Sequence, residues 1–504
     1  MRHDVVFCTP LRMEAKALRS GLSPAGARSV VTTGAGRQHA HKAAADPRLQ
    51  NASATAVVGI AGALDPRLQP GDVVVADELR DNAGVCSATP HPTARMVAAQ
   101  LRRDGLRVWV GPVLSSDHMV TGAEREVLAS SGALAVDMES AWLAPSGRPG
   151  VVVRVAADVA GERLLQPSTL GRVRTAVRTL PKVAPSLQEW AHSIGPRTVL
   201  LAEPRSFCAG VERAIEVVER ALEQRGAPIY VRKQIVHNQH VVSQLQERGA
   251  VFVEELADVP EGSTVVFSAH GVSPAVWGAA RERELDIIDA TCPLVTKVHS
   301  EVRRFGDRGD SVIFIGHAGH EETEGTMGER PEQTVLVESA DDAAEVEVAD
   351  PERVSYLVQT TLSAHEVEGV VDVLRGRFPN LRAPASDDIC YATTNRQDAL
   401  QAVALDSDLV LVVGSQNSSN SQRLVETSER WGTPAYLVDD VGDIDLAWLA
   451  GADTVGLTAG ASAPRALVDE VVDAMRGLGP VEVQDRQLVT ENVHFTLPKE
   501  VRPA

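Results

Sequence analysis

The sequence predicts an α/β protein composed of two units. Short apolar runs rich in β-branched residues recur along the 504 residues, and helical patterns lie between them. Regular alternation of strands and helices is typical of parallel sheets whose connections are helices. Ligands of such sheets bind at the carboxyl ends of the strands. The residues that follow each apolar run are therefore the first candidates for a functional site.

Eight runs have the length and composition of buried strands, and each ends in small or polar residues. They are Ala56–Ile60, Val73–Ala76, Val151–Val155, Thr264–Phe267, Val312–Ile315, Val354–Val358, Leu409–Val413 and Thr454–Leu457. Helices are predicted between them, for example over Val211–Gln224 and Ala463–Met475. The pattern extends through both halves of the chain, so both units are expected to be α/β.

A domain boundary is predicted near residues 180–197. The stretch Leu180–Ser186 contains two prolines, and Thr198–Ala202 has the composition of a new buried strand. We therefore expect one domain over residues 1–190 and a second unit of two or three lobes over residues 197–504.

Charge is distributed unevenly between these parts. Residues 1–196 carry 22 basic and 17 acidic side chains, whereas the rest of the chain carries 27 and 51. This asymmetry favours two units of different origin. A strongly acidic second unit also argues against nucleic-acid binding, which requires a basic surface.

The composition excludes several other classes of protein. Hydrophobic residues make up 44% and charged residues 23% of the chain, as in ordinary globular proteins. No apolar run is long enough for a membrane span, and the first residues become polar too soon for a signal peptide. Five cysteines do not form a disulfide framework, so we expect a reducing, cytoplasmic location and no membrane partner.

Polar loops that follow the strands of the second unit predict a shared cavity. Seven such loops begin at Glu203, Ser268, Ala290, Gly316, Gln359, Gly414 and Thr458. One loop of this kind is ordinary turn chemistry. Seven in one unit, two with Cys and two with His, indicate that their side chains meet.

Three of the cysteines, Cys208, Cys292 and Cys390, belong to this unit. Buried structural thiols are one interpretation, because unpaired cysteines are often buried. The sequence contains no Cys-x-x-Cys pair of the common zinc and ferredoxin types. Each cysteine lies among polar residues at a predicted strand or helix end. Together they could hold an iron–sulfur cluster with one iron that has no protein ligand, and zinc bound by Cys₃ and a His is the competing metal site.

Neutral and weakly basic donors in the same loops predict an anion site. They are His237, His270, His320, Thr360, Ser418, Ser419, Asn420 and Ser462. Helix N-termini and hydroxyl groups can hold a diphosphate without lysine. Preorganised donors are needed because the acidic unit repels anions at long range. Glu322 is the candidate proton donor, since burial beside such a site raises the pKa of a carboxyl group.

Residues 198–504 resemble the 4-hydroxy-3-methylbut-2-enyl diphosphate reductases, which act last in the non-mevalonate isoprenoid pathway. The resemblance is carried by PRSFCAGVERAI, IVHNQHVV, FSAHGVS, DATCPLVTKVH, GHAGHEETEGTMGE, QTTLS, DDICYATTNRQ, VGSQNSSNSQRL and TAGASAP. It implies three α/β lobes arranged like a trefoil around a central 4Fe–4S cluster. Glu321 stands where other members have Pro, and we expect no consequence of this difference.

The resemblance also assigns roles to the residues named above. It implies that Cys208, Cys292 and Cys390 ligate three irons, that Glu322 relays a proton and that Thr360 positions the substrate hydroxyl. The diphosphate ligands that it implies are His237, His270, His320, Ser418, Ser419, Asn420 and Ser462. The implied reaction is a two-electron reductive dehydration that yields isopentenyl or dimethylallyl diphosphate. Electrons are expected from ferredoxin or flavodoxin, because no GxGxxG follows a strand in this unit.

The first unit carries weaker motifs. Gly-rich segments follow apolar runs at Thr32–Gly36 and Gly59–Ala63, and acidic residues stand at Glu14, Glu139 and Asp158. With their neighbours, these residues resemble the nucleoside phosphorylase and nucleosidase superfamily, and most of all the hopanoid-associated nucleosidases.

That resemblance implies that Glu139 binds the ribose hydroxyls while Met138 packs on the sugar. It further implies that Asp158 protonates a purine leaving group and that Glu14 acts at the water or ribose side. Ala157 replaces the usual Ser before the acid, and the domain is short, so a non-catalytic domain is the alternative. For the second unit the alternatives are a zinc-containing phosphate-binding protein and an interaction scaffold.

Overall fold

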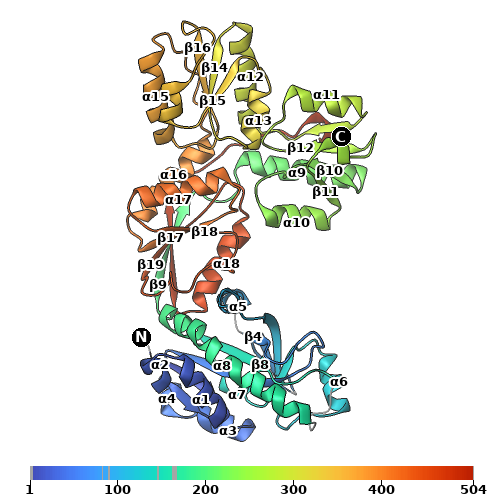
Figure 1. Ribbon diagram of the computed structural model, residues 1–504, viewed down its shortest axis with the longest axis vertical. Helices are drawn as coiled ribbons and strands as arrows, with labels where there is room; N and C mark the ends of the chain where they lie inside the picture. The colour runs from blue at the N-terminus through green and yellow to red at the C-terminus, as the bar shows by residue number, and fades with distance from the viewer. Residues whose placement is uncertain (1–3, 82, 89–90, 145–146, 162–166, 503–504) are drawn as a thin grey trace. The chain divides into compact units, whose positions relative to one another are not determined.

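The computed structural model describes residues 4–81, 83–88, 91–144, 147–161 and 167–502 (Figure 1). The chain folds into two compact units. The first unit comprises residues 1–199, 438–455 and 469–484, and the second comprises residues 200–437, 456–468 and 485–504. None of the described helices is long and apolar enough to cross a membrane.

The first unit contains an eight-stranded sheet with the order β2-β1-β3-β7-β6-β4-β5, and β8 pairs with both β3 and β4. Its strands are β1 (Val5–Thr9), β2 (Val30–Thr32), β3 (Ala54–Ala63), β4 (Val73–Asp81), β5 (Gly84–Ala88), β6 (Val108–Ser115), β7 (Ala135–Asp137) and β8 (Gly150–Ala156). The helices are α1 (Arg12–Gly21), α2 (Pro24–Arg28), α3 (Arg37–Ala44), α4 (Pro47–Gln50), α5 (His91–Arg103), α6 (Ala123–Ala129), α7 (Ser140–Leu143) and α8 (Pro167–Ser193).

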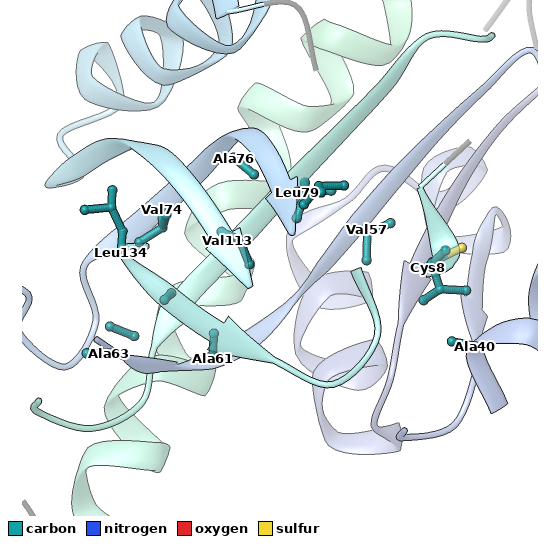
Figure 2. Packing of buried hydrophobic residues seen from close by; sticks show 14 of the residues in the cluster. Cys8, Ala40, Val57, Ala61, Ala63, Val74, Ala76, Leu79, Val113 and Leu134 are labelled. Atoms are coloured by element: carbon teal, nitrogen blue, oxygen red, sulfur yellow. The ribbon is translucent and has the colours of Figure 1, made fainter. Parts of the chain in front are cut away.

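This sheet is mixed rather than parallel. β1 pairs in parallel with β2 and β3, as the sequence predicts, but β4 runs antiparallel to both β5 and β8. The small and branched side chains of the strands build a continuous core, part of which Figure 2 shows around Val57, Leu79 and Val113. Cys8 lies in this core and is fully buried.

The two prolines that predict a break near residue 180 lie inside α8. Pro185 has no N–H, so the carbonyl of Pro181 lacks its intrahelical donor. That carbonyl lies against Gly21, where a Cβ atom would overlap it. Leu180, Leu187 and other apolar side chains of α8 are fully buried. Tertiary packing thus maintains the helix where the local sequence predicts a linker.

Three sheets follow α8. The first has the order β11-β10-β12-β13 and the second the order β15-β14-β16, and all their strand pairs are parallel. The third has the order β18-β17-β19-β9-β20, and the division into units passes through it. The strands are β9 (Arg197–Glu203), β10 (Ile229–Arg232), β11 (Ala250–Val253), β12 (Thr264–Phe267), β13 (Asp286–Asp289), β14 (Ser311–Ile315), β15 (Thr334–Val337), β16 (Val354–Val358), β17 (Leu409–Val413), β18 (Ala435–Val438), β19 (Thr454–Ala459) and β20 (Val481–Gln487).

Helices alternate with these strands, so the predicted α/β class is confirmed. They are α9 (Ala209–Arg225), α10 (Gln239–Glu247), α11 (Pro274–Glu282), α12 (Pro293–Asp307), α13 (Glu321–Met327), α14 (Ala340–Glu345), α15 (Ala364–Arg377), α16 (Tyr391–Ala404), α17 (Ser419–Arg430) and α18 (Arg465–Arg476). All eight strands predicted from apolar runs are present, with ends that differ by a few residues.

Candidate functional site

Three cysteines of the second unit each cap the N-terminus of a helix. Cys208 precedes α9, Cys292 precedes α12 and Cys390 precedes α16. The partial positive charge of a helix N-terminus favours an anionic group at that position. The three thiols line one cavity of about 110 Å³.

The cavity brings together all twelve residues that the sequence predicts for this unit. Its lining includes Cys208, His237, His270, Cys292, His320, Glu322, Thr360, Cys390, Ser418, Ser419, Asn420 and Ser462. Most of them lie in loops or first helical turns after a strand. The carboxyl ends of the strands therefore provide the site, as expected for α/β sheets.

The thiols of Cys208 and Cys292 border one small space beside Gly210. A Cβ atom at Gly210 would lie 2.7 Å from Sγ of Cys292 and 3.8 Å from Sγ of Cys208, so only glycine leaves this space open. Burial, and then the neighbouring thiols, raise the pKa of Cys292 to about 12. Burial likewise raises the pKa of Cys390 to about 11. Deprotonation at neutral pH therefore requires a positive partner, and thiolates are ligands that soft metal ions and iron–sulfur clusters prefer.

The spacing of the donor atoms bears on the kind of metal centre. Among the described residues, the one group of three metal-ligating side chains with donor atoms within 4.8 Å of one another is His237, His270 and Glu321. The three cysteines do not form such a group. A single tetrahedral zinc with Zn–S bonds of about 2.3 Å would need sulfur atoms about 3.8 Å apart. The three cysteine donor atoms are therefore spaced more widely than a single zinc ion requires.

Three imidazoles gather on one side of the cavity. The rings of His237 and His270 stack with centroids 4.1 Å apart, and His320 lies edge-on to both. Burial, and then the neighbouring histidines, lower the pKa of His237 to about 2 and that of His320 to about 4. Both rings are therefore neutral at pH 7. Nε2 of His237 is buried without a hydrogen-bond partner among the described residues, so it is available to a ligand.

Hydroxyl and amide groups of two loops complete this polar wall. Ser418 caps α17, and its Oγ lies 3.4 Å from Oγ of Ser462. Ser462 donates to the carbonyl oxygen of His237 (3.0 Å). Asn420 accepts from the backbone N–H of Ala461 (2.9 Å). These contacts fix the donors on a rigid frame, so that a ligand can be bound with little reorganisation.

Glu322 is almost fully buried on α13 and faces Thr360. Its carboxylate accepts from the backbone N–H of Thr360 (2.7 Å) and from the Thr360 hydroxyl (2.9 Å). Burial raises the pKa of Glu322, although both hydrogen bonds oppose the change. A carboxyl group with a raised pKa retains its proton to a higher pH than an exposed glutamate, and it can transfer that proton to a bound group.

Glu321 has a structural role that the sequence does not indicate. Its carboxylate oxygen lies 3.1 Å from Nδ1 of His270 and accepts from the Ser268 hydroxyl (3.2 Å). Burial raises the pKa of Glu321, but the hydrogen bond and charge of His270, together with Lys233 and the Ser268 hydroxyl, outweigh it and the net shift is downward. The carboxylate therefore orients the imidazole. Only the fold reveals this, because Ser268 and His270 are distant from Glu321 in sequence.

Comparison with known proteins identifies this part of the chain. The sequence model of the family described as LytB protein matches residues 199–476, more than half of the chain. The chain belongs to the LytB family. It is 58% identical over 324 residues to 4-hydroxy-3-methylbut-2-enyl diphosphate reductase 2 of Mycobacterium bovis and to reductase 1 of Mycobacterium tuberculosis, which covers 64% of this chain and 98% of each relative.

A solved structure supports the same assignment for the part of the chain that follows α8, which we call the LytB unit (residues 197–504). The E-1-hydroxy-2-methyl-but-2-enyl-4-diphosphate reductase of Plasmodium falciparum is 38% identical and superposes with a TM-score of 0.59, over 61% of this chain and 97% of that protein. A second family model, the phosphorylase superfamily, matches residues 26–179. The predicted fusion of a LytB protein to a phosphorylase-like domain is thereby confirmed.

The phosphorylase-like domain has a separate cavity of about 400 Å³. Glu14, Met138, Glu139 and Asp158 all line it, as the sequence predicts. Glu14 accepts from the backbone N–H groups of Leu11 (2.7 Å) and Ile60 (2.8 Å), and Glu139 accepts from Gly36 (2.8 Å). Burial raises the pKa of both glutamates.

Arg154 is fully buried behind the two glutamates, and the sequence does not predict a role for it. Its guanidinium lies 2.7 Å from Asp137 and 3.5 Å from Glu139. It also lies close to Glu14, whose pKa it lowers in opposition to burial. This cation offsets the repulsion between three carboxylates at one end of the cavity.

Asp158 occupies the other end and is engaged by Arg125 of α6. Nη1 of Arg125 donates to the Asp158 carboxylate (2.9 Å), Nη2 donates to its second oxygen, and the N–H of Ala63 donates to that same oxygen (2.8 Å). Both side chains are buried. The family resemblance implies a proton donor at this position, whereas here one arginine engages both oxygens of the carboxylate. Arg125 lies in an ordinary polar segment, so no local signal reveals this pair.

The buried imidazoles predict a pH-dependent stability of the LytB unit. The pKa of His320 is about 4 in the folded chain and about 6.5 in an unfolded one. The unfolded chain alone therefore gains this proton as the pH falls below about 6.5, and stability is lost progressively toward pH 4. We expect a loss of about 2 kcal/mol at pH 5 from this group. In His320→Gln, the urea midpoint should fall less between pH 7 and pH 5 than in the wild type.

The exposed His365 provides a matched control for this measurement. His365→Gln should keep the wild-type pH response in substrate-free protein. An equal response in wild type and His320→Gln would contradict the assigned neutral state of His320.

Proposed function

We propose that the LytB unit reduces 4-hydroxy-3-methylbut-2-enyl diphosphate to isopentenyl and dimethylallyl diphosphate, the last step of the non-mevalonate pathway. The observation that carries the proposal is the cavity that three cysteines, three imidazoles and several hydroxyls line together. The names of relatives at 58% identity support the same activity. The overall change consumes two electrons and two protons and releases one water.

Cys208, Cys292 and Cys390 would hold a 4Fe–4S cluster. When bound, the cluster supplies electrons one at a time and a Lewis-acidic iron that has no protein ligand. Three helix N-termini at the cysteines support this assignment, because they stabilise the negative charge of the thiolates. The spacing of the thiols disfavours the zinc alternative.

The diphosphate would bind to the wall formed by His237, His270 and His320 together with Ser418, Ser419, Asn420 and Ser462. These groups are neutral or weakly basic donors on preformed loops, so they satisfy phosphate oxygens without a lysine. A diphosphate would also offset the cost of burying imidazoles, since its negative charge favours their protonated form. The role of Glu321 would be to keep His270 in its binding orientation.

Glu322 would supply the proton with which the substrate hydroxyl leaves as water. Its raised pKa keeps the carboxyl group protonated at a higher pH than an exposed glutamate. Thr360 contacts both carboxylate oxygens, so it can orient the carboxyl group and the substrate hydroxyl together. The apolar parts of the cavity lining exclude water from the reacting groups.

The electrons would come from a separate carrier of the ferredoxin or flavodoxin class in the cytoplasm. Cys208, Cys292 and Cys390 are unpaired in the structure, which agrees with a reducing compartment.

The cysteine assignment predicts a linked loss of cluster and activity. Anaerobically purified wild type should be brown and contain iron and sulfide. Cys292→Ser should lose most of the iron and the reductase activity together, because one cluster ligand is replaced by a poorer one. The buried Cys8 of the first unit provides the control, and Cys8→Ala should retain both. Full iron content and activity in Cys292→Ser would remove it from the ligand set.

The proton-donor assignment predicts a different pattern. Glu322→Gln should keep the iron content of the wild type while turnover falls by about 100-fold or more, since the amide cannot donate the required proton. Glu324 lies on the same helix but is half exposed and pairs with Lys233, so Glu324→Gln is the matched control. An unchanged rate in Glu322→Gln would assign the proton to another group.

We further propose that the phosphorylase-like domain cleaves the N-glycosidic bond of a nucleoside. A cavity of about 400 Å³ with a buried Glu139 beside the Gly-rich loop favours this activity, because a carboxylate can accept hydrogen bonds from two ribose hydroxyls. Glu14 and Arg154 could hold the attacking water at the same end. Asp158 could donate a proton only after Arg125 releases it.

The test is adenine release from adenosyl compounds by the full chain. Glu139→Gln should lower kcat/KM by about 100-fold, because the ribose loses its charged acceptor. The exposed Glu126 gives the control variant Glu126→Gln, which should behave as the wild type. No release by the wild type would contradict the proposal and favour a non-catalytic domain.

A further inference from the structure

A basic side chain follows each cluster cysteine along its helix. Arg213 lies five residues after Cys208 on α9, and Lys297 lies five residues after Cys292 on α12. Arg396 lies six residues after Cys390 on α16. None of these cations takes part in the proposed reaction. All three donate hydrogen bonds to loops of other parts of the LytB unit.

Arg213 reaches the loop that leads into Cys292. Its Nη1 donates to the carbonyl oxygens of Ala290 (3.1 Å) and Thr291 (3.0 Å), the two residues before that cysteine. The helix that starts at Cys208 is therefore tied to the backbone that presents Cys292.

Lys297, on the helix that starts at Cys292, contacts the segment that leads into Cys390. Its ammonium group donates to the carbonyl oxygens of Ser386 (2.8 Å) and Asp387 (2.7 Å) and to the carboxylate of Asp388 (2.9 Å). All three ammonium protons are thus used on the segment that precedes Cys390. The Asp388 side chain is fully buried and also accepts from the backbone N–H of Val358 (3.0 Å), which anchors this segment to β16.

Arg396, on the helix that starts at Cys390, contacts the loop that leads into Cys208. It is fully buried, and its guanidinium donates to the carbonyl oxygens of Ser206 (2.7 Å) and Phe207 (3.2 Å), immediately before Cys208. The three links therefore form a closed cycle. Each cysteine-capped helix fixes the loop of the next cysteine, and the third helix fixes the loop of the first.

We propose that Arg213, Lys297 and Arg396 are positioning residues that hold the three thiols at the separation required by the cluster. This rests on the cluster assigned under the proposed function. A charged donor bound to two or three carbonyls restrains a loop more firmly than one neutral hydrogen bond. Groups that orient metal ligands in this way affect metal affinity about 10- to 100-fold when they are removed.

The cycle predicts which cysteine each substitution affects, and a general loss of packing would not produce this pattern. Loss of one cation should loosen the cysteine at the end of its link, not the cysteine on its own helix. Lys297→Met should therefore affect Cys390, whereas Arg213→Met should affect Cys292. Half-buried Arg283 gives a matched control, since it donates to the carbonyls of Val259 (2.7 Å) and Ala257 (3.4 Å) and contacts none of the cysteine loops.

The first measurement is the alkylation rate of each cysteine by iodoacetamide in the iron-free full chain, followed by mass spectrometry. Lys297→Met should raise the rate at Cys390 by about tenfold, and Arg213→Met should do so at Cys292. Lys297→Arg, which keeps the charge, should restore most of the wild-type rate. Arg283→Met should change none of the rates by more than about twofold. Equal rates in variants and wild type, or a uniform rise at all three cysteines, would overturn the cycle.

The second measurement uses the reconstituted holoenzyme. In Lys297→Met and Arg213→Met, a chelator should remove the cluster about tenfold faster than in the wild type. The electron paramagnetic resonance spectrum of the reduced cluster should also differ from that of the wild type. A wild-type rate and spectrum in both variants would overturn the proposal. A wild-type chain that assembles no cluster would instead refute the proposed function, while the alkylation pattern would still decide whether the links position the thiols.

Discussion

The LytB unit depends on the convergence of three half-buried thiols at three helix N-termini. Cys208, Cys292 and Cys390 lie far apart in sequence, and burial raises the pKa of the second and third well above neutrality. Such thiols become anionic only when a positive centre compensates the charge. The helix starts contribute part of that compensation and a metal cluster would contribute the rest. The loops, caps and glycine around the cavity serve to keep this arrangement open, as the space at Gly210 illustrates.

The imidazoles and hydroxyls that line the same cavity face a different electrostatic constraint. The part of the chain that contains them is strongly acidic, whereas the proposed ligand is a diphosphate anion. The structure uses preformed neutral donors rather than a basic patch, and it suppresses the charge of His237 and His320 by burial. The negative charge of a bound anion would raise the pKa of these imidazoles again, because it favours their protonated form. Selectivity then arises from short-range geometry, because long-range attraction is absent.

In the phosphorylase-like domain, the residues that the family resemblance implies are present, but one of them makes an additional contact. Its cavity contains every acidic residue that the family resemblance implies, and Glu14 and Glu139 are hydrogen-bonded by the Gly-rich loops and strand ends expected for a sugar site. Arg125 nevertheless engages the one residue to which the resemblance assigns acid catalysis. The identity of the residue is therefore preserved, while a neighbouring arginine changes the contacts that its carboxylate makes. Activity must be argued from such contacts, since a shared fold hosts many functions.

The sequence alone determined the α/β class, the eight main strands and twelve of the residues that line the LytB cavity, because apolar periodicity and long motifs are local properties of the chain. It misjudged α8, where the packing of Leu180 and Leu187 overrides two prolines. The tertiary structure alone decided the contacts of Glu321 with His270 and of Arg125 with Asp158. It also decided the hydrogen bonds from Arg213, Lys297 and Arg396 to the cysteine loops. Glutamate, arginine and lysine are common on surfaces, and their partners here are distant in sequence or are backbone carbonyls. Only folding brings these groups within hydrogen-bonding distance, and so only the folded chain reveals what they do.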